Sequence, residues 1–243
     1  MIAKLIAATE FYSDEVVEVG YNIAVREDGG GPYGPPVNES ADELAEFAGR
    51  GCYRSFDRPN PATAQNVDYL RHILDVGHES VLEHASATFY IEASRSLLAE
   101  LTRHRHLSFS VVSQRYVAPE SLGDFHIPPA VDALPGDLAE WTKAKLRGAY
   151  PAAMRVYNDL LDEFTAHGLP RKQAREAARA VLPNMTNSPM VVSGNHRAWR
   201  YVIKARWHAA ADAEIRGLAG ELLRQLRTVA PNTYQDIPDA PYS

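Results

Sequence analysis

The 243-residue sequence contains a single cysteine and few lysines. With Cys52 alone, an intrachain disulfide and a cysteine-rich metal site are excluded. The place of Cys52 after a helical pattern predicts a packed thiol and not a nucleophile. Only 5 lysines accompany 20 arginines. Because the planar guanidinium binds anions in a bidentate manner, this excess favours anion recognition, although a GC-rich genome would give the same bias.

Long apolar runs are also missing. No stretch is long enough to span a bilayer, and no charged start leads into the apolar segment of an export leader. We therefore expect a cytoplasmic protein without membrane contact. The net charge of −6 argues against a general nucleic-acid binder, whose footprint would be basic. With 45% hydrophobic residues, no linker and no repeat, residues 1–243 are expected to form one domain.

Hydrophobic residues recur at strand spacing in short segments and at helical spacing in longer ones. Strands are expected at residues 4–9, 87–91 and 190–193. Helices are expected from residue 40, at residues 63–77, ahead of residue 103, and at residues 137–167, 171–182 and 196–229. Pro151 interrupts one of these patterns and predicts a kink or two abutting helices. The mixture indicates a helix-rich α/β or α+β protein.

Residues 26–38 are rich in glycine and proline and should form a loop. Within them, Gly29-x-Gly31-x-x-Gly34 formally matches the dinucleotide fingerprint. Two prolines follow at once and no helix opens there, so the required strand-turn-helix context is missing. We interpret the pattern as a loop, and a Rossmann fold would not hold any flavin that this chain binds.

Residues 103–116 concentrate arginine, histidine, serine and glutamine side chains in a chain that is acidic overall. Arginine donors match phosphate or a deprotonated ring, whereas a solvated face or a nucleic-acid patch is the ordinary alternative. Leucines at helical spacing precede the segment, which is therefore expected to end a packed helix. In a helix, Arg103 and Arg105 would point roughly 200° apart, so we expect two ligand groups here and not one phosphate clamp.

Further arginines lie at helical spacing. Arg206 falls on an apolar stripe that includes Trp199 and Ile203. A buried charge needs an anionic partner, which leaves open a ligand or a structural salt bridge to a glutamate. Arg171 and Arg175 recur four residues apart, which is typical of a solvated helix face.

Two histidine pairs superficially suggest metal binding. His78 and His84 are six residues apart, which places them roughly 240° apart on a helix and away from a shared metal. His104 and His106 fail similarly if their segment is helical. No metal site is therefore expected.

Residues 103–116 resemble the signature of flavin-dependent thymidylate synthases, the ThyX family. The shared pattern is Arg-His-Arg, then two residues and a Ser, and later Ser-x-Arg-Tyr. Similar blocks occur in order at residues 46–53, 69–78, 80–85, 171–175 and 194–200. The resemblance implies a helix-rich single domain around a central mixed or antiparallel sheet. It also implies a homotetramer whose active sites form between subunits.

The resemblance further implies the ligands and the residues that hold them. FAD would be bound by Ser80, Arg103, His104, Arg105, Val111, Asn195, His196, Arg197 and Tyr201. The substrate dUMP would lie against Glu100, Leu101, Thr102 and Arg103 of one subunit and Val111, Val112, Ser113, Gln114 and Arg115 of another, with Arg179 nearby. Arg206 would be the catalytic residue, since a fixed cation beside the uracil ring stabilises its ionised form.

In the family reaction, methylene-tetrahydrofolate supplies one carbon to dUMP, and NADPH-reduced FAD supplies the hydride that completes the methyl group of dTMP. Ser113 has no visible general base and is assigned to hydrogen bonding. Ser110 and Val111 stand where many relatives carry Asn and Glu or Gln, and Tyr201 where some carry His, which bears on affinity more than on reaction type. A nucleic-acid-binding module and a flavoprotein oxidoreductase without methyl transfer remain the competing hypotheses.

Overall fold

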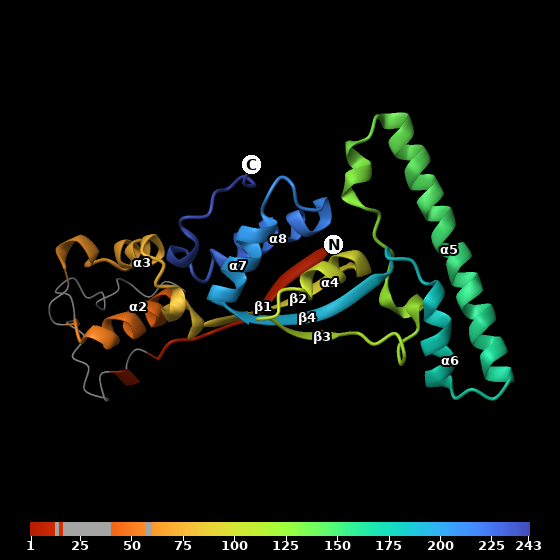
Figure 1. The fold of residues 1–243 in the computed structure, drawn as a ribbon, viewed down its shortest axis with the longest axis horizontal. Coiled ribbons are helices and arrows are strands. Elements are labelled where there is room, and N and C mark those ends of the chain that lie inside the picture. The colour runs from red at the N-terminus through yellow and green to blue at the C-terminus, as the bar shows by residue number, and fades with distance from the viewer. Residues whose placement is uncertain (13–14, 17–39, 57–59) are drawn as a thin grey trace.

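The computed structural model describes residues 1–12, 15–16, 40–56 and 60–243 (Figure 1). The expected loop at residues 26–38 and its glycine pattern lie outside these residues. Seven α-helices and four strands occur in the described part of the chain, which confirms a helix-rich α/β protein. None of the helices described here has both the length and the apolar character needed to cross a bilayer.

A four-stranded antiparallel sheet occupies the middle of the molecule (Figure 1). Its strands lie in the order β1-β2-β4-β3. Alternate residues Ala87, Phe89 and Ile91 are buried, because every second side chain of β2 faces the same side. All the predicted strands are confirmed, and β3 is an addition. The bounds are Ile2–Ala8 for β1, Ser86–Ser94 for β2, Ser108–Val111 for β3 and Asn187–Asn195 for β4.

The helices form three groups along an elongated molecule (Figure 1). Helices α2 and α3 lie at one end, α4, α7 and α8 pack around the sheet, and α5 and α6 form an arm at the other end. The bounds are Ser40–Tyr53 for α2, Asn66–Asp75 for α3, Arg95–Leu101 for α4, Gly136–Ala166 for α5, Arg171–Ala178 for α6, His196–Arg206 for α7 and Ala213–Leu226 for α8.

The main core lies between the sheet and α4, α7 and α8. Trp199 of α7 is fully buried, meets Phe89 edge-on at 5.2 Å between ring centroids, and donates from its indole nitrogen to the Ala87 carbonyl at 3.0 Å. A Cβ at Gly194 would lie 2.4 Å from the Leu107 side chain. A larger residue at this position would therefore require the buried Leu107 side chain, which precedes β3, to move away from the end of β4.

Three local predictions are wrong. The two abutting helices that were one alternative at Pro151 are not found, since α5 continues through it as one helix of 31 residues. Pro151 and Arg147, whose carbonyl loses its helical partner there, are both exposed, so water can satisfy that carbonyl. Cys52 is exposed and not packed. Arg175 is buried and donates to the Tyr116 carbonyl, so it does not belong to a solvated face.

The basic segment is not helical either. Helix α4 ends at Leu101, and residues 102–107 form turns in which the His104 amide donates to the Leu101 carbonyl at 3.0 Å. The Leu107 amide then donates to the His104 carbonyl at 3.2 Å. The expected helical separation of Arg103 and Arg105 therefore does not apply.

A buried carboxylate joins α8 to the start of α4. Glu214 accepts hydrogen bonds from the Ser94 amide at 2.9 Å and the Ser94 hydroxyl at 2.5 Å. The Glu214→Ala substitution is expected to lower the free energy of unfolding by about 2–3 kcal/mol, because buried donors lose a charged acceptor. Arg224→Ala on the same helix removes an exposed pair with Glu221 and should cost less than about 1 kcal/mol. Equal losses in urea unfolding of the two variants would contradict this assignment.

Candidate functional site

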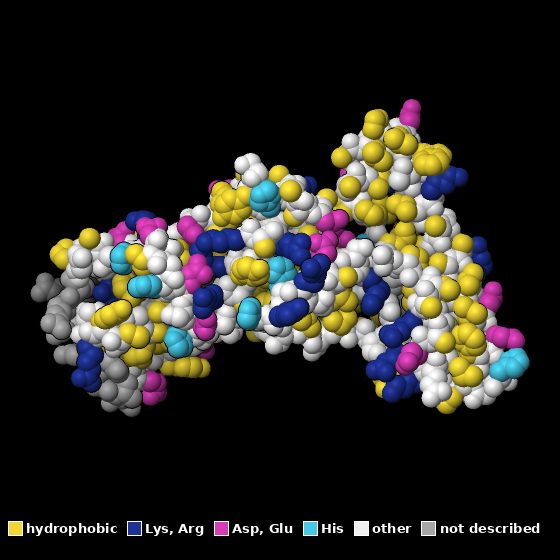
Figure 2. Space-filling view, viewed as in Figure 1, with side chains coloured by type: hydrophobic (Ala, Val, Ile, Leu, Met, Phe, Trp, Pro, Cys, Tyr) yellow, Lys and Arg dark blue, Asp and Glu magenta, His cyan; other side chains and the backbone are white. Residues whose placement is uncertain are grey.

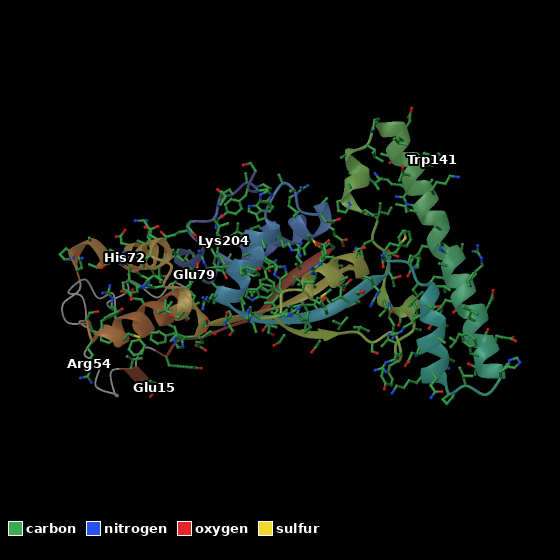
Figure 3. All side chains as sticks on the ribbon, viewed as in Figure 1. Glu15, Arg54, His72, Glu79, Trp141 and Lys204 are labelled. Atoms are coloured by element: carbon green, nitrogen blue, oxygen red, sulfur yellow. The ribbon has the colours of Figure 1, made fainter. Side chains whose placement is uncertain are left out.

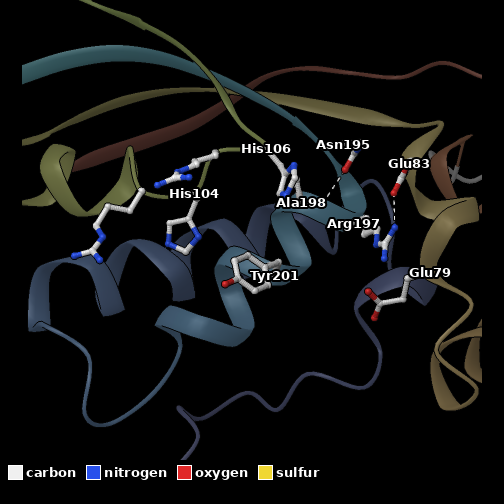
Figure 4. Close-up of a pocket in the computed structure, with 10 residues that line it drawn as sticks. Glu79, Glu83, His104, His106, Asn195, Arg197, Ala198 and Tyr201 are labelled. Carbon is white, nitrogen blue, oxygen red and sulfur yellow. Dashed lines mark hydrogen bonds and ion pairs between the residues drawn. The ribbon is translucent and has the colours of Figure 1, made fainter.

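A cavity of about 790 Å³ opens where the end of β4 meets the start of α7 (Figure 4). Its volume lies in the range of small-molecule and cofactor sites. Its walls come from the 3-10 helix η2 (Glu79–Glu83), the turns at residues 102–107, the last residue of β4 and the first turns of α7. The lining residues are Glu79, Glu83, Arg103, His104, Arg105, His106, Asn195, Arg197, Ala198 and Tyr201.

Strand register brings these distant segments together. Ser86 of β2 pairs with Asn195 of β4, which places the residues just before β2 at the end of β4. Ser108 of β3 pairs with Ser193, which brings the basic turns to the same place. The Asn195 side chain then accepts from the Ala198 amide at 2.8 Å and caps α7, so the helix begins at the cavity wall.

Charges of both signs line the cavity. Arg197 pairs with Glu83 at 2.5 Å, and Glu79 lies 3.8 Å from Lys204 where η2 faces α7 (Figures 3 and 4). Arg103 and Arg105 are exposed and form no ion pair with any residue in the described ranges. Two uncompensated guanidiniums at the wall of a cavity are suited to a bound anion such as a phosphate.

Next to the cavity, Arg206 forms a polar cluster with His104 and Glu100. Its Nε donates to His104 Nε2 at 3.0 Å, and its Nη1 donates to the Glu100 carboxylate at 2.7 Å. Burial and the positive charge of Arg206 hold the pKa of His104 below its usual value. Arg206 is the last residue of α7, and its side chain is 21% exposed. The guanidinium is therefore anchored by the protein and still open to solvent.

The chain is similar to known proteins over most of its length. The family model described as thymidylate synthase complementing protein matches residues 37–232. The probable flavin-dependent thymidylate synthase of Mycobacterium phage L5 is 65% identical over 245 residues, which cover 100% of both chains. That of Mycobacterium phage D29 is 74% identical over 204 residues, 84% of this chain and 86% of the relative. The flavin-dependent thymidylate synthase of Mycolicibacterium gilvum is 49% identical over 237 residues, 96% of this chain and 88% of the relative.

The chain belongs to the flavin-dependent thymidylate synthase family. The resemblance found in the sequence motifs is thereby confirmed, and with it the class of enzyme. These relationships do not assign individual site residues, whose placement comes from the structure.

Five of the nine FAD-contact residues expected from the family resemblance meet at the cavity, and Tyr201, which is also among the nine and is 62% exposed, makes a sixth. Ser80 is exposed on η2, between the two lining glutamates. Val111 lies at the far end of β3 and does not line the cavity. The five are Arg103, His104, Arg105, Asn195 and Arg197.

The substrate residues expected for this family divide into two groups. Glu100 and Arg103 lie by the cavity, with Leu101 buried in the core and Thr102 exposed between them. Ser113, Gln114 and Arg115 follow the other end of β3, and none of them lines the cavity.

Strand β3 separates the two groups by about 13 Å, the length of four extended residues. The Val112 amide donates to the Pro189 carbonyl at 3.0 Å, near the opposite end of β4 from the cavity. Arg179 precedes that same end of β4 in a 3-10 turn. Figure 2 accordingly shows basic side chains gathered over the α7 region and again over the lower part of α6.

Four lining residues had not been singled out as ligand-contact residues: Glu79, Glu83, His106 and Ala198. The two glutamates lie on either side of Ser80, in a segment that the sequence suggested as a failed metal motif and, for residues 80–85, as a block similar to the family. In the described residues, no three His, Cys, Asp or Glu side chains gather as a metal site. Their contribution to the cavity depends on strand register, which their local sequence does not specify.

The His196 side chain faces the core and not the cavity. Its Nδ1 lies 2.9 Å from the Tyr234 hydroxyl, and burial lowers its pKa to about 4. The unfolded chain takes up a proton on this imidazole below about pH 6.5, whereas the folded protein resists protonation until about pH 4. His196 therefore reduces stability progressively as the pH falls from 6.5 to 4.

Moving from pH 7.5 to pH 5 should lower the free energy of unfolding by about 2 kcal/mol through His196 alone. Urea unfolding of the wild type and of His196→Phe at both pH values isolates this contribution, since the other titrating groups are shared. The variant should lose less stability on acidification than the wild type. Identical pH dependence in the two proteins would contradict a buried neutral imidazole.

Proposed function

We propose that this protein converts dUMP to dTMP, with methylene-tetrahydrofolate as carbon donor and NADPH as the reductant of bound FAD. The observation that carries the proposal is Arg206, a guanidinium that the protein anchors on His104 and Glu100 beside a cationic cavity. His104 belongs to both the cluster and the cavity wall. A substrate held by Arg206 would therefore lie next to a cofactor held in the cavity.

The residues of the cavity fit FAD. Unpaired Arg103 and Arg105 supply donors for a pyrophosphate, and Arg197 adds a third guanidinium. Tyr201 offers an exposed aromatic face, and Asn195 stands at the start of α7, where helix dipole and amides favour an anion. When bound, FAD reduced by NADPH supplies the hydride that completes the methyl group.

The chemical role proposed for Arg206 is electrostatic. Its cationic guanidinium would donate to the uracil ring, which lowers the cost of negative charge on that ring. Glu100 and His104 fix the guanidinium before the substrate arrives, so little reorganisation is needed during reaction.

We also propose that the active site is completed by a second subunit of a homotetramer. Ser113, Gln114, Arg115 and Arg179 carry the donors expected to contact dUMP, yet in one chain they lie beyond the far end of β3 from the cavity. If residues 1–243 act as one domain in a symmetric assembly, each chain would present these residues to the cavity of a neighbouring chain. Light scattering of the purified protein should give four times the chain mass of 26.9 kDa.

The visible absorption spectrum of the FAD-reconstituted protein, before and after addition of dUMP, tests whether one site holds both ligands. A flavin spectrum that shifts on addition of dUMP supports the proposal. A protein that neither retains FAD nor responds to dUMP would contradict it. Salt-sensitive binding to long RNA would then favour the nucleic-acid alternative, because phosphate contacts weaken as salt rises.

A further inference from the structure

The guanidinium of Arg206 has more N–H donors than the described residues accept from. Arginine carries five N–H groups in a planar fork. One is donated to His104 at 3.0 Å and one to the Glu100 carboxylate at 2.7 Å, and Nη2 lies 3.5 Å from the Glu100 carbonyl. Two N–H groups, one on each terminal nitrogen, remain for a ligand. The direction of these two N–H groups depends on the partners that hold Nε and the rest of the guanidinium.

The Nε–H group of Arg206 donates its hydrogen bond to His104. Because arginine is only a donor, His104 Nε2 must be the acceptor and cannot carry a proton. The ring is therefore neutral, with its proton on Nδ1. That Nδ1 is buried and has no hydrogen-bond partner in the described part of the chain. The described residues thus give the acceptor nitrogen a defined partner and leave the buried donor nitrogen without one. The ring also meets Tyr201 edge-on at 5.7 Å between centroids.

We propose that neutral His104 is a positioning residue for Arg206, acting through Nε2 to aim the two free N–H groups of the guanidinium at the uracil ring. This inference rests on the proposed function, since it concerns how Arg206 meets dUMP. It is separate from any contact between His104 and FAD, because it concerns only the hydrogen bond between Arg206 Nε and His104 Nε2.

The arrangement has a pH consequence. Protonation of Nε2 would remove the acceptor and place a positive charge directly against Arg206. Arg206 and the nearby Arg103 and Arg105 oppose that proton, Glu100 favours it, and Tyr201 faces the ring edge. Burial and the charge of Arg206 lower the pKa of His104 from its usual value of 6.5. Binding of dUMP should therefore weaken only below that value.

Three substitutions at His104 distinguish the role of Nε2 as an acceptor from the other contributions of the ring. His104→Gln can place an amide oxygen near the position of Nε2 and keeps the acceptor for Arg206. The amide of His104→Asn is too short to reach that position, and His104→Phe keeps an aromatic ring without an acceptor. Affinity for dUMP is measured by calorimetry on FAD-loaded protein from pH 5 to 8, with flavin content as a check on folding.

The glutamine variant should bind dUMP within about threefold of the wild type and lose the weakening at acid pH. The asparagine and phenylalanine variants should bind at least about tenfold more weakly at pH 8, which corresponds to loss of one charge-assisted hydrogen bond. Equal affinities in all three variants, whether reduced or unchanged, would overturn the proposal. If the variants do not fold, a wild-type affinity for dUMP that already weakens above pH 6.5 through a protonation of the protein would overturn it as well, because burial and Arg206 lower the pKa of His104 from that value.

The wild type itself distinguishes this failure from failure of the proposed function. A wild type that binds no dUMP contradicts the function. A wild type that binds dUMP, combined with glutamine and asparagine variants that behave alike, contradicts only the role of His104.

Discussion

Replacing Arg206 by alanine is expected to reduce dTMP formation by about 10²–10³-fold, the cost of removing one aligned donor from a developing negative charge. FAD should remain bound, because Arg206 does not line the cavity. Removal of the side chain also frees His104 Nε2 and the Glu100 carboxylate; the Glu100 side chain is 33% exposed and can be solvated. Flavin content and urea unfolding of the variant check that the fold persists. The loss should therefore fall on turnover and dUMP binding, with flavin content unchanged.

Two companion variants sharpen this test. Arg206→Lys keeps the charge but loses the fork, so it should recover only part of the activity. Arg224→Ala removes a 66% exposed arginine of α8 that pairs with Glu221, and it should leave activity unchanged. Product formation is measured under saturating dUMP. Full activity in Arg206→Ala would remove the assignment of this residue as catalytic.

Co-expression of Arg206→Ala chains with Arg179→Ala chains is expected to restore activity that neither variant has alone. If a site takes Arg206 from one subunit and Arg179 from another, some sites in a mixed tetramer contain both native side chains. Random assembly of equal amounts would give about a quarter of the sites this composition. Two different affinity tags allow the mixed tetramers to be purified and their dTMP formation measured.

The matched control pairs Arg206→Ala with Arg103→Ala. Arg206 and Arg103 lie on the cavity side of β3, so each site takes both of them from one and the same chain. Because every chain in this mixture carries one of the two substitutions, no site has both native arginines. Recovery in the first mixture but not in the second supports shared sites. Absence of recovery in the first mixture, with tetramers present, would place Arg206 and Arg179 in the site of a single chain.

Hydrophobic spacing was sufficient to predict β1, β2, β4 and the long helix α5. Each of these elements presents one apolar face to a partner, so its periodicity is visible in the sequence. The end of α4 at Leu101 was missed because no glycine, asparagine or proline follows it. The chain leaves the helix through ordinary residues whose amides bond back to Leu98, Glu100 and Leu101, as a tertiary fold can impose.

The site was only partly predictable for a related reason. Arg103, His104 and Arg105 stand out as a cluster in the sequence, and Asn195 marks a helix start. Glu79 and Glu83 reach the same cavity only through the register of β2 on β4, which joins residues more than 100 positions apart. Likewise, the burial of Arg175 depends on a contact with Tyr116, 59 residues away.

Product analysis of the complete reaction tests the central claim most directly. The purified protein is incubated with FAD, NADPH, dUMP and methylene-tetrahydrofolate, and the nucleotide is identified by mass spectrometry. The account predicts dTMP, formed only when FAD is present and matched by an equal amount of tetrahydrofolate. Consumption of NADPH with dUMP recovered unchanged would contradict the account and identify a flavoprotein oxidoreductase without methyl transfer.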